Sequence, residues 1–188
     1  MFQTLRNSWK IPDLRKKMLF TLSMLMIFRL GSFIPVPGMN TEALSKLIQS
    51  GGLLGFFNTI SGGAFDNFAI FAMSITPYIN STIIMQLLTI AIPSLEALAK
   101  EGEEGRRKIA QYTRYGTVVL ALIQAVALSY GLKGYLLRTD AASVILVALS
   151  LTAGTAFLMW LGEQINEKGI GNGISIIIMI GIVSQFPR

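Results

Sequence analysis

Apolar and polar residues follow one another along this chain in long blocks. Five apolar stretches cover residues 18–34, 74–92, 115–132, 142–161 and 173–186, and polar, charged or glycine-rich segments separate them. A transmembrane helix needs about 20 predominantly apolar residues, and the fifth stretch reaches a workable length only if the residues flanking Ile174–Val183 contribute. The pattern predicts an all-α integral membrane protein, a multi-spanning helical bundle that forms a single transmembrane domain over residues 1–188.

The second apolar stretch carries more polar side chains than a simple anchor needs. Pro77 lies near its start, and Asn80, Ser81, Thr82 and Gln86 follow. Each polar group in hydrocarbon is costly unless a neighbouring helix or water satisfies it. We therefore expect this helix to face protein or a cavity on one side, which favours a conduit over an anchor.

Composition narrows the chemistry. Hydrophobic residues make up 52% of the chain and charged residues 14%, against about 25% charged in an ordinary soluble domain. The chain contains no Cys and no His, which removes thiol chemistry, Ser-His catalysis and the usual zinc sites. We expect no enzymatic activity, no cofactor, no metal and no nucleic-acid site.

Residues 53–67 are apolar but too short and too rich in glycine to cross a bilayer. A short helix capped by Asn40 or Thr41 is expected before them, ending at Gly51 and Gly52. The length of the 53–67 segment predicts a re-entrant or buried element.

The basic residues predict the orientation of the chain. They gather in residues 1–17, where an amphipathic surface helix is expected, and in the loop expected between the second and third spans, which holds Arg106, Arg107, Lys108 and Arg114. The opposite side has only Lys46, Lys133 and Arg138. Because Lys and Arg mark the cytoplasmic side, the N-terminus is expected in the cytoplasm, with anionic lipid beside the basic segments.

Arg29 is a charge within the first apolar stretch. Such residues usually face the interior of a bundle, which makes a functional role one interpretation. The other is structural: pairing with carbonyls at a helix end or with an acid, or extension of the side chain to the nearby outer surface.

Two further motifs have ordinary explanations. Gly169–Gly173 reads GIGNG, but a dinucleotide fingerprint needs a preceding strand and a longer glycine spacing, so a tight turn is expected. Glu101, Glu103 and Glu104 beside arginines lack the spacing of a metal site and are expected in a solvated loop of mixed charge.

Four segments, taken together, resemble the SecY family of bacterial protein-translocation channels. Phe28–Gly38 is similar to the end of that family's first span, and Phe57–Ala64 to the segment after it. Glu101–Thr117 resembles the family's first cytoplasmic loop, and Met159–Ile165 with Gly169–Ser175 resembles the loop before the fifth span. These matches cover nearly the whole chain, in order.

The resemblance implies the N-terminal half of an inverted-repeat channel with an hourglass pore and a lateral gate. It assigns an apolar pore ring to Ile75, Ile79 and Ile178, and a lateral gate to Asn80, Ile83, Gln86 and Gln124. The plug helix would comprise Leu53, Leu54, Gly55, Phe56, Phe57, Asn58, Thr59, Ile60, Ser61, Gly62, Gly63, Ala64 and Phe65.

The resemblance also implies function and partners. The expected activity is passage of unfolded secretory proteins across the bacterial cytoplasmic membrane, and lateral release of membrane segments into it. The expected partners are SecE, SecG, the SecA ATPase or the ribosome, preproteins and their signal sequences. Since the chain ends within the expected fifth span, we expect the second half to come from further sequence or from another chain.

Two other classes of protein remain as alternatives. A small-solute secondary transporter would also use broken helices and polar spans, but the acidic residues fall in or near the expected loops, where they would not couple ions within the membrane. An intramembrane enzyme would need His, Cys or an intramembrane Asp pair.

Overall fold

The computed structural model describes residues 11–49 and 52–184, and the folded part is all-helical. Helices account for all the regular secondary structure of these described residues. The order is α2 (Pro12–Gly31), α3 (Thr41–Gln49), α4 (Leu53–Ile60), α5 (Thr76–Ala91), α6 (Pro93–Lys100), α7 (Glu103–Gly131), the 3₁₀ turn η1 (Lys133–Tyr135), α8 (Ala141–Lys168) and α9 (Gly173–Val183).

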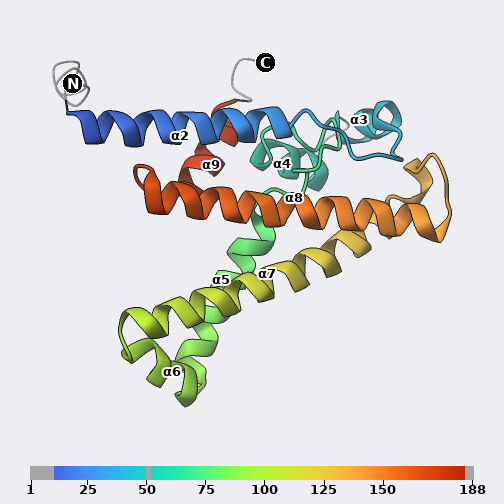
Figure 1. Cartoon of the computed structure of the whole chain (residues 1–188). Coiled ribbons are helices and arrows are strands. Elements are labelled where there is room, and N and C mark those ends of the chain that lie inside the picture. The colour runs from blue at the N-terminus through green and yellow to red at the C-terminus, as the bar shows by residue number, and fades with distance from the viewer. Residues whose placement is uncertain (1–10, 50–51, 185–188) are drawn as a thin grey trace.

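Helices α2 and α8 lie side by side and run in opposite directions, while the long helix α7 crosses at an angle against α8 (Figure 1). Helix α5 packs against α7, and α9 packs against both α2 and α8. The short helices α3 and α4 lie near the C-terminal end of α2, and α6 lies at the far end of the molecule beside the first turns of α7 (Figure 1). The long irregular segment between α4 and α5 returns the chain to the centre of the bundle.

Two hydrophobic clusters hold this arrangement together. One joins α3, η1 and the ends of α7 and α8; its fully buried members include Leu44, Phe68 and Leu151. The other joins α2, the 64–75 segment, α8 and α9 around Phe28, Phe71, Leu158 and Ile177. Phe28 stacks on Phe71 with ring centroids 6.1 Å apart, so the irregular segment is fixed to α2 by aromatic packing.

Local sequence explains several helix ends. Asn172 Oδ1 accepts hydrogen bonds from the backbone N–H groups of Ile174 and Ser175 and caps α9, as asparagine does at helix starts. Asn40 Oδ1 accepts from the N–H of Ala43 at the start of α3, as expected. Helix α5 ends before Pro93, which lacks an N–H, and α6 leaves at 100° to it.

Residues 94–114 were expected to form a basic loop, and this prediction is wrong. The structure forms α6 and the first three turns of α7 there, separated by Gly102 at φ +85°. The charged segment is rich in Ala, Glu, Lys and Arg, which are good helix formers, and Glu103 and Glu104 lie in the first turn of α7, where negative charge stabilises the helix dipole.

Other boundaries shift by several residues. Helix α2 begins before the predicted first span and ends at Gly31 rather than at the prolines, and α8 continues to Lys168, beyond the predicted end of the fourth span. The surface helix expected over residues 1–17 falls mostly on residues 1–10, outside the described part of the chain.

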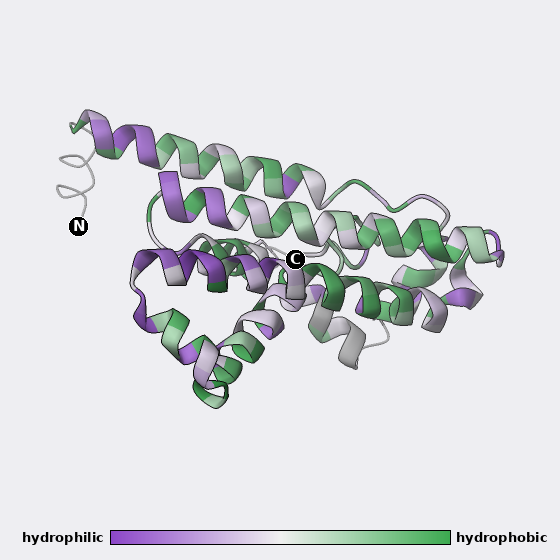
Figure 2. Ribbon diagram, turned by 60° about the horizontal axis from the view of Figure 1, so that its bottom comes forward, coloured by the Kyte–Doolittle hydropathy of each residue, from purple (hydrophilic) through white to green (hydrophobic). Residues whose placement is uncertain are grey.

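Within the described ranges, α8 is the single helix that is long and apolar enough by itself to cross a bilayer, and the bent pair α5–α6 would make a second candidate. Helix α9 is apolar but shorter. Hydrophilic residues gather at the start of α2, the start of α7 and the end of α8, on one side of the molecule, while hydrophobic residues cover the middle of these helices (Figure 2). This distribution is typical of helices that cross a bilayer with their charged ends in water.

Candidate channel site

The three isoleucines of the expected pore ring lie on one hydrophobic cluster. Ile75 precedes the first turn of α5 and is 1% exposed, and Ile79 follows one turn later. Ile178 lies in the middle of α9. Ile79 and Ile178 are half-buried against the same cluster that contains Ile75 and Ala64. The fold thus brings together side chains about 100 positions apart in sequence, beside the segment that was expected to form a plug.

The expected plug is a short helix followed by a hydrogen-bonded turn. Asn58, near the end of α4, donates from Nδ2 to Asp66 Oδ2 at 2.8 Å and accepts the Asp66 N–H at Oδ1. Ser61 Oγ donates to the Asn58 carbonyl and accepts the Phe65 N–H. These bonds make residues 58–66 a compact unit. The structure does not describe the side chains of Leu53, Leu54 and Phe57. Of the other predicted plug residues, α4 also carries Gly55, Phe56, Thr59 and Ile60, and the turn after it contains Gly63.

This unit packs against α9 at a contact between two glycines. A Cβ on Gly62 would lie 2.9 Å from the Cα of Gly181, and one on Gly181 would lie 3.0 Å from the carbonyl oxygen of Ile60. Gly62 also has φ +68°, a conformation that glycine adopts at no steric cost. Side chains at these two positions would separate the 58–66 unit from α9.

Arg29 extends into this contact rather than into lipid. Its Nη1 donates to the Gly62 carbonyl at 2.8 Å and to Ser184 Oγ at 3.3 Å, and its guanidinium lies 4.9 Å from the centroid of the Phe33 ring. Arg29 therefore pairs with a backbone carbonyl, as the structural interpretation predicted, and this pairing does not conflict with a functional role. The apolar sequence around Arg29 gave no signal of its partners.

The expected gate residues divide between two surface grooves on α5 and α7. Asn80, Ile83 and Gln124 line one of about 250 Å³ together with Ile84 and Leu120. Gln86 lines the other, also of about 250 Å³, whose walls carry the polar groups of Tyr78, Thr82, Thr89, Thr113 and Arg106. Three of the four predicted residues thus share a groove, and the fourth lies in the adjacent one.

The contact between α5 and α7 itself is close and polar. Ser81 Oγ donates to the Thr113 carbonyl at 2.9 Å, and a Cβ on Gly116 would lie 2.7 Å from Ser81 Oγ. Small residues allow helix backbones to approach each other in this way. The two helices that carry the expected gate therefore pack as one unit.

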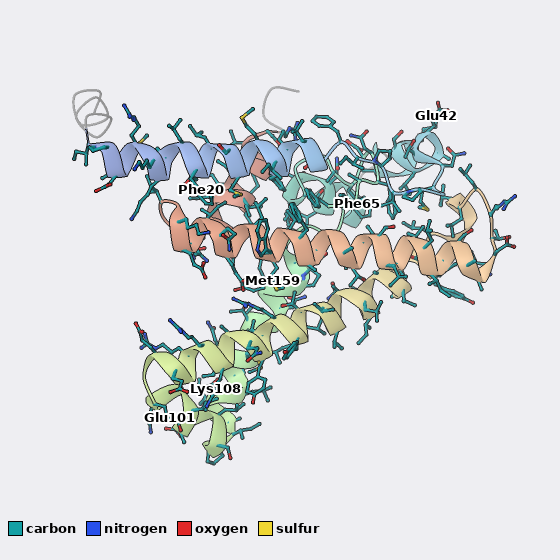
Figure 3. All side chains as sticks on the ribbon, in the orientation of Figure 1. Phe20, Glu42, Phe65, Glu101, Lys108 and Met159 are labelled. Carbon is teal, nitrogen blue, oxygen red and sulfur yellow. The ribbon has the colours of Figure 1, made fainter. Side chains whose placement is uncertain are left out.

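Arg106, Arg107 and Lys108 are exposed on the first turns of α7, where Lys108 and Glu101 lie at the far end of the molecule (Figure 3). Arg114, expected with them, instead donates from Nε to Glu163 Oε1 of α8 at 2.7 Å. No sequence pattern predicted this pair, because Arg114 and Glu163 lie 49 positions apart, each beside a different apolar stretch. Within the part of the chain that the structure describes, no three acidic side chains gather in a way that would hold a metal ion.

Comparison with known proteins decides the family. The SecY family model matches residues 69–188, about two thirds of the chain. This chain belongs to the SecY family. Its relatives include proteins described as "Protein translocase subunit SecY" from Halalkalibacterium halodurans, 55% identical over all of this chain, and from Bacillus subtilis, 52% identical over all of it. The relative with that description from Escherichia coli is 50% identical over 94% of the chain.

The chain spans about 45% of the length of the first two SecY relatives and 42% of the third. Two solved structures share its fold with a TM-score of 0.64, at 20% sequence identity and over 90% of this chain but 36% of theirs. They are described as "The structure of a protein conducting channel" and "Sec61 in the Canine ribosome-channel complex from the endoplasmic reticulum". The expected all-α SecY-type fold is thereby confirmed.

Proposed function

We propose that this chain forms the N-terminal part of a protein-conducting channel in the bacterial cytoplasmic membrane. Unfolded secretory proteins would pass through it, and membrane segments would leave it sideways into lipid. The chain acts as a passive conduit and not as an enzyme, with energy supplied by partners. The family membership and the shared channel fold support this proposal.

The observation that carries the proposal is the convergence of Ile75, Ile79 and Ile178 on one cluster with Ala64 from the 58–66 unit. A narrow ring of aliphatic side chains resists wetting and so resists the leak of ions. Branched aliphatic side chains seal around a moving polypeptide without demanding specific hydrogen bonds. Ala64 of the 58–66 unit belongs to the same cluster, which supports closure of the ring by this unit.

The grooves on α5 and α7 support a lateral gate at Asn80, Ile83, Gln86 and Gln124. Ile83 is exposed although it is apolar, which suits contact with lipid or with an apolar signal segment. Weak polar contacts across a closed seam would let such a segment displace the opposite wall. That wall would belong to the second half of the channel.

We further propose SecE and SecG as membrane partners, and SecA or the ribosome as cytoplasmic partners. One structural neighbour is described as part of a ribosome–channel complex, which supports a partner on the face that receives the nascent chain. The exposed basic residues Arg106, Arg107 and Lys108 at the start of α7 would face that partner and the anionic lipid of the cytoplasmic surface.

The conductance of single channels tests the ring. Replacing Ile75 and Ile79 with glycine in the complete channel that carries this sequence should raise its resting ion conductance, because the seal loses two of its bulky side chains. The matched control is Ile90→Gly, the same change on α5 at a side chain that is 79% exposed, which should leave the conductance unchanged. Equal conductance in all three channels would reject the ring.

A further inference from the structure

Arg29 joins three segments that are otherwise only in van der Waals contact. It is rooted in the last turn of α2, donates to the carbonyl of Gly62 in the 58–66 unit, and donates to Ser184 at the end of α9. Ser184 Oγ in turn donates to the Gly181 carbonyl at 2.7 Å. Arg29, Gly62, Gly181 and Ser184 therefore form one connected junction.

The junction is polar within an apolar setting. The neighbouring residues on α2, Phe28 and Leu30, and those on α9, Ile180 and Ile182, are all apolar. A hydrogen bond from a charged donor is about twice as strong as a neutral one, and it strengthens where water is excluded. Leaving the guanidinium without an acceptor there is unfavourable, so Arg29 opposes any movement that takes the Gly62 carbonyl away.

The rest of the 58–66 unit is held by its own hydrogen bonds and by packing. Its internal hydrogen bonds, between Asn58 and Asp66 and around Ser61, would travel with it as a rigid body. Its closest backbone contact with α9 is made by glycines, which bury little apolar surface, while Ala64 and Phe65 are buried in the two hydrophobic clusters. Detachment of the unit would therefore withdraw these two side chains and break the Arg29 junction, which is its one contact with a charged side chain of α2 among the hydrogen bonds described.

We propose that Arg29 is a latch that holds the 58–66 unit closed against α9. Release requires that the guanidinium leave the Gly62 carbonyl and that Ala64 and Phe65 leave their clusters. Because α2 and α9 are separate helices, a partner or substrate that moves either one would release the unit. The assignment of this latch to channel gating rests on the proposed function of the unit as a plug; the latch itself rests on the contacts alone.

The rate at which a thiol at position 61 reacts tests the latch directly. The chain has no cysteine, and Ser61, next to the Gly62 that contacts α9, is 1% exposed, so Ser61→Cys, present in every channel compared, reports openings of this contact to a water-soluble maleimide. In the complete channel at rest, Arg29→Met should increase that rate about tenfold to a hundredfold, the change expected from losing hydrogen bonds from a charged donor. Arg29→Lys, which keeps the charge, should give a smaller increase.

A second buried serine serves as the control. Ser129 on α7 is 0% exposed, and Ser129→Cys should react at the same slow rate with either residue at position 29. An unchanged rate at position 61, or an equal rise at both positions, would overturn the latch, since the second result would mean general loosening. Arg29→Met removes a charge from an apolar helix, which favours insertion of that helix into the membrane. We therefore expect the variant channel to be inserted.

A wedge on the other side of the contact gives an independent variant. Gly181→Val should push the Ile60 carbonyl away and raise the rate at position 61 with Arg29 intact, while Gly131→Val, where a Cβ has open space, should not. No rise with Gly181→Val would contradict the proposed contact. If the rate rises in these variants but the conductance of the channel stays at rest level, the latch holds and the role of the unit as a plug is wrong.

Discussion

Arg114 on α7 and Glu163 on α8 form an ion pair, with Nε and Oε1 2.7 Å apart. Their side chains are 47% and 18% exposed, so the carboxylate is largely shielded from water. The two helices also make the most extensive helix–helix contact in the described bundle. This charged pair therefore adds to the packing that positions α7, which carries part of the expected gate, against α8.

Replacing Glu163 with glutamine should lower the free energy of unfolding in detergent by about 1–2 kcal/mol, because Arg114 then keeps only a neutral acceptor. The pair of Lys100 with Glu96 is the control. It joins residues four apart on α6, and its side chains are 74% and 50% exposed, so Glu96→Gln should cost less than about 0.5 kcal/mol. Equal losses would mean that the α7–α8 pair contributes no more than a surface pair.

The close contact of α5 with α7 predicts a coupled pair of substitutions. Gly116→Ala should destabilise the protein by about 1–3 kcal/mol, because the new methyl group meets Ser81 Oγ. Adding Ser81→Ala removes that oxygen and should recover part of the loss. A double-mutant cycle with zero coupling energy would contradict the contact, and Gly131→Ala, with open space around its Cβ, is the control for changing a helix glycine.

The orientation predicted from basic residues can be tested at two acidic positions. Glu42 and Glu101 lie at opposite ends of the molecule (Figure 3), and both are exposed. Acidic residues contribute little to orientation, so changing them should not invert the chain. Glu42→Cys should react with a membrane-impermeant maleimide in intact cells, and Glu101→Cys only after the membrane is opened. The reverse pattern would place the N-terminus outside the cytoplasm.

Features of the fold that depend on a few neighbouring residues could be predicted from the sequence. Pro93 ends α5, Asn40 caps α3, and the order of the main helices follows the order of the apolar stretches. The helices in residues 94–114 were not predicted. The charge of this segment suggested a loop, but its helix-forming residues and Gly102 produce a helical hairpin. The alternation of long apolar and polar segments indicates which residues face lipid and which face water. It does not distinguish a charged loop from a charged helix.

The long-range polar contacts of the candidate site could not be predicted from sequence patterns. Arg114 and Glu163 lie 49 positions apart, and Arg29 lies 33 positions from Gly62 and 155 from Ser184. Their meeting depends on how the helices cross, and no local propensity specifies that. The pore ring came from family resemblance, and its three isoleucines share one cluster in the structure; its role as a seal stays a prediction.

Contact between a moving polypeptide and the isoleucine ring tests whether Ile79 and Ile178 line a pore. In the complete channel that carries this cysteine-free sequence, a secretory precursor with one cysteine is stalled midway, and disulfide formation with single cysteines in the channel is measured. We expect a bond with Ile79→Cys and with Ile178→Cys, and none with Ile90→Cys on the exposed side of α5. Bonding at position 90 with none at 79 and 178 would contradict a pore at these isoleucines.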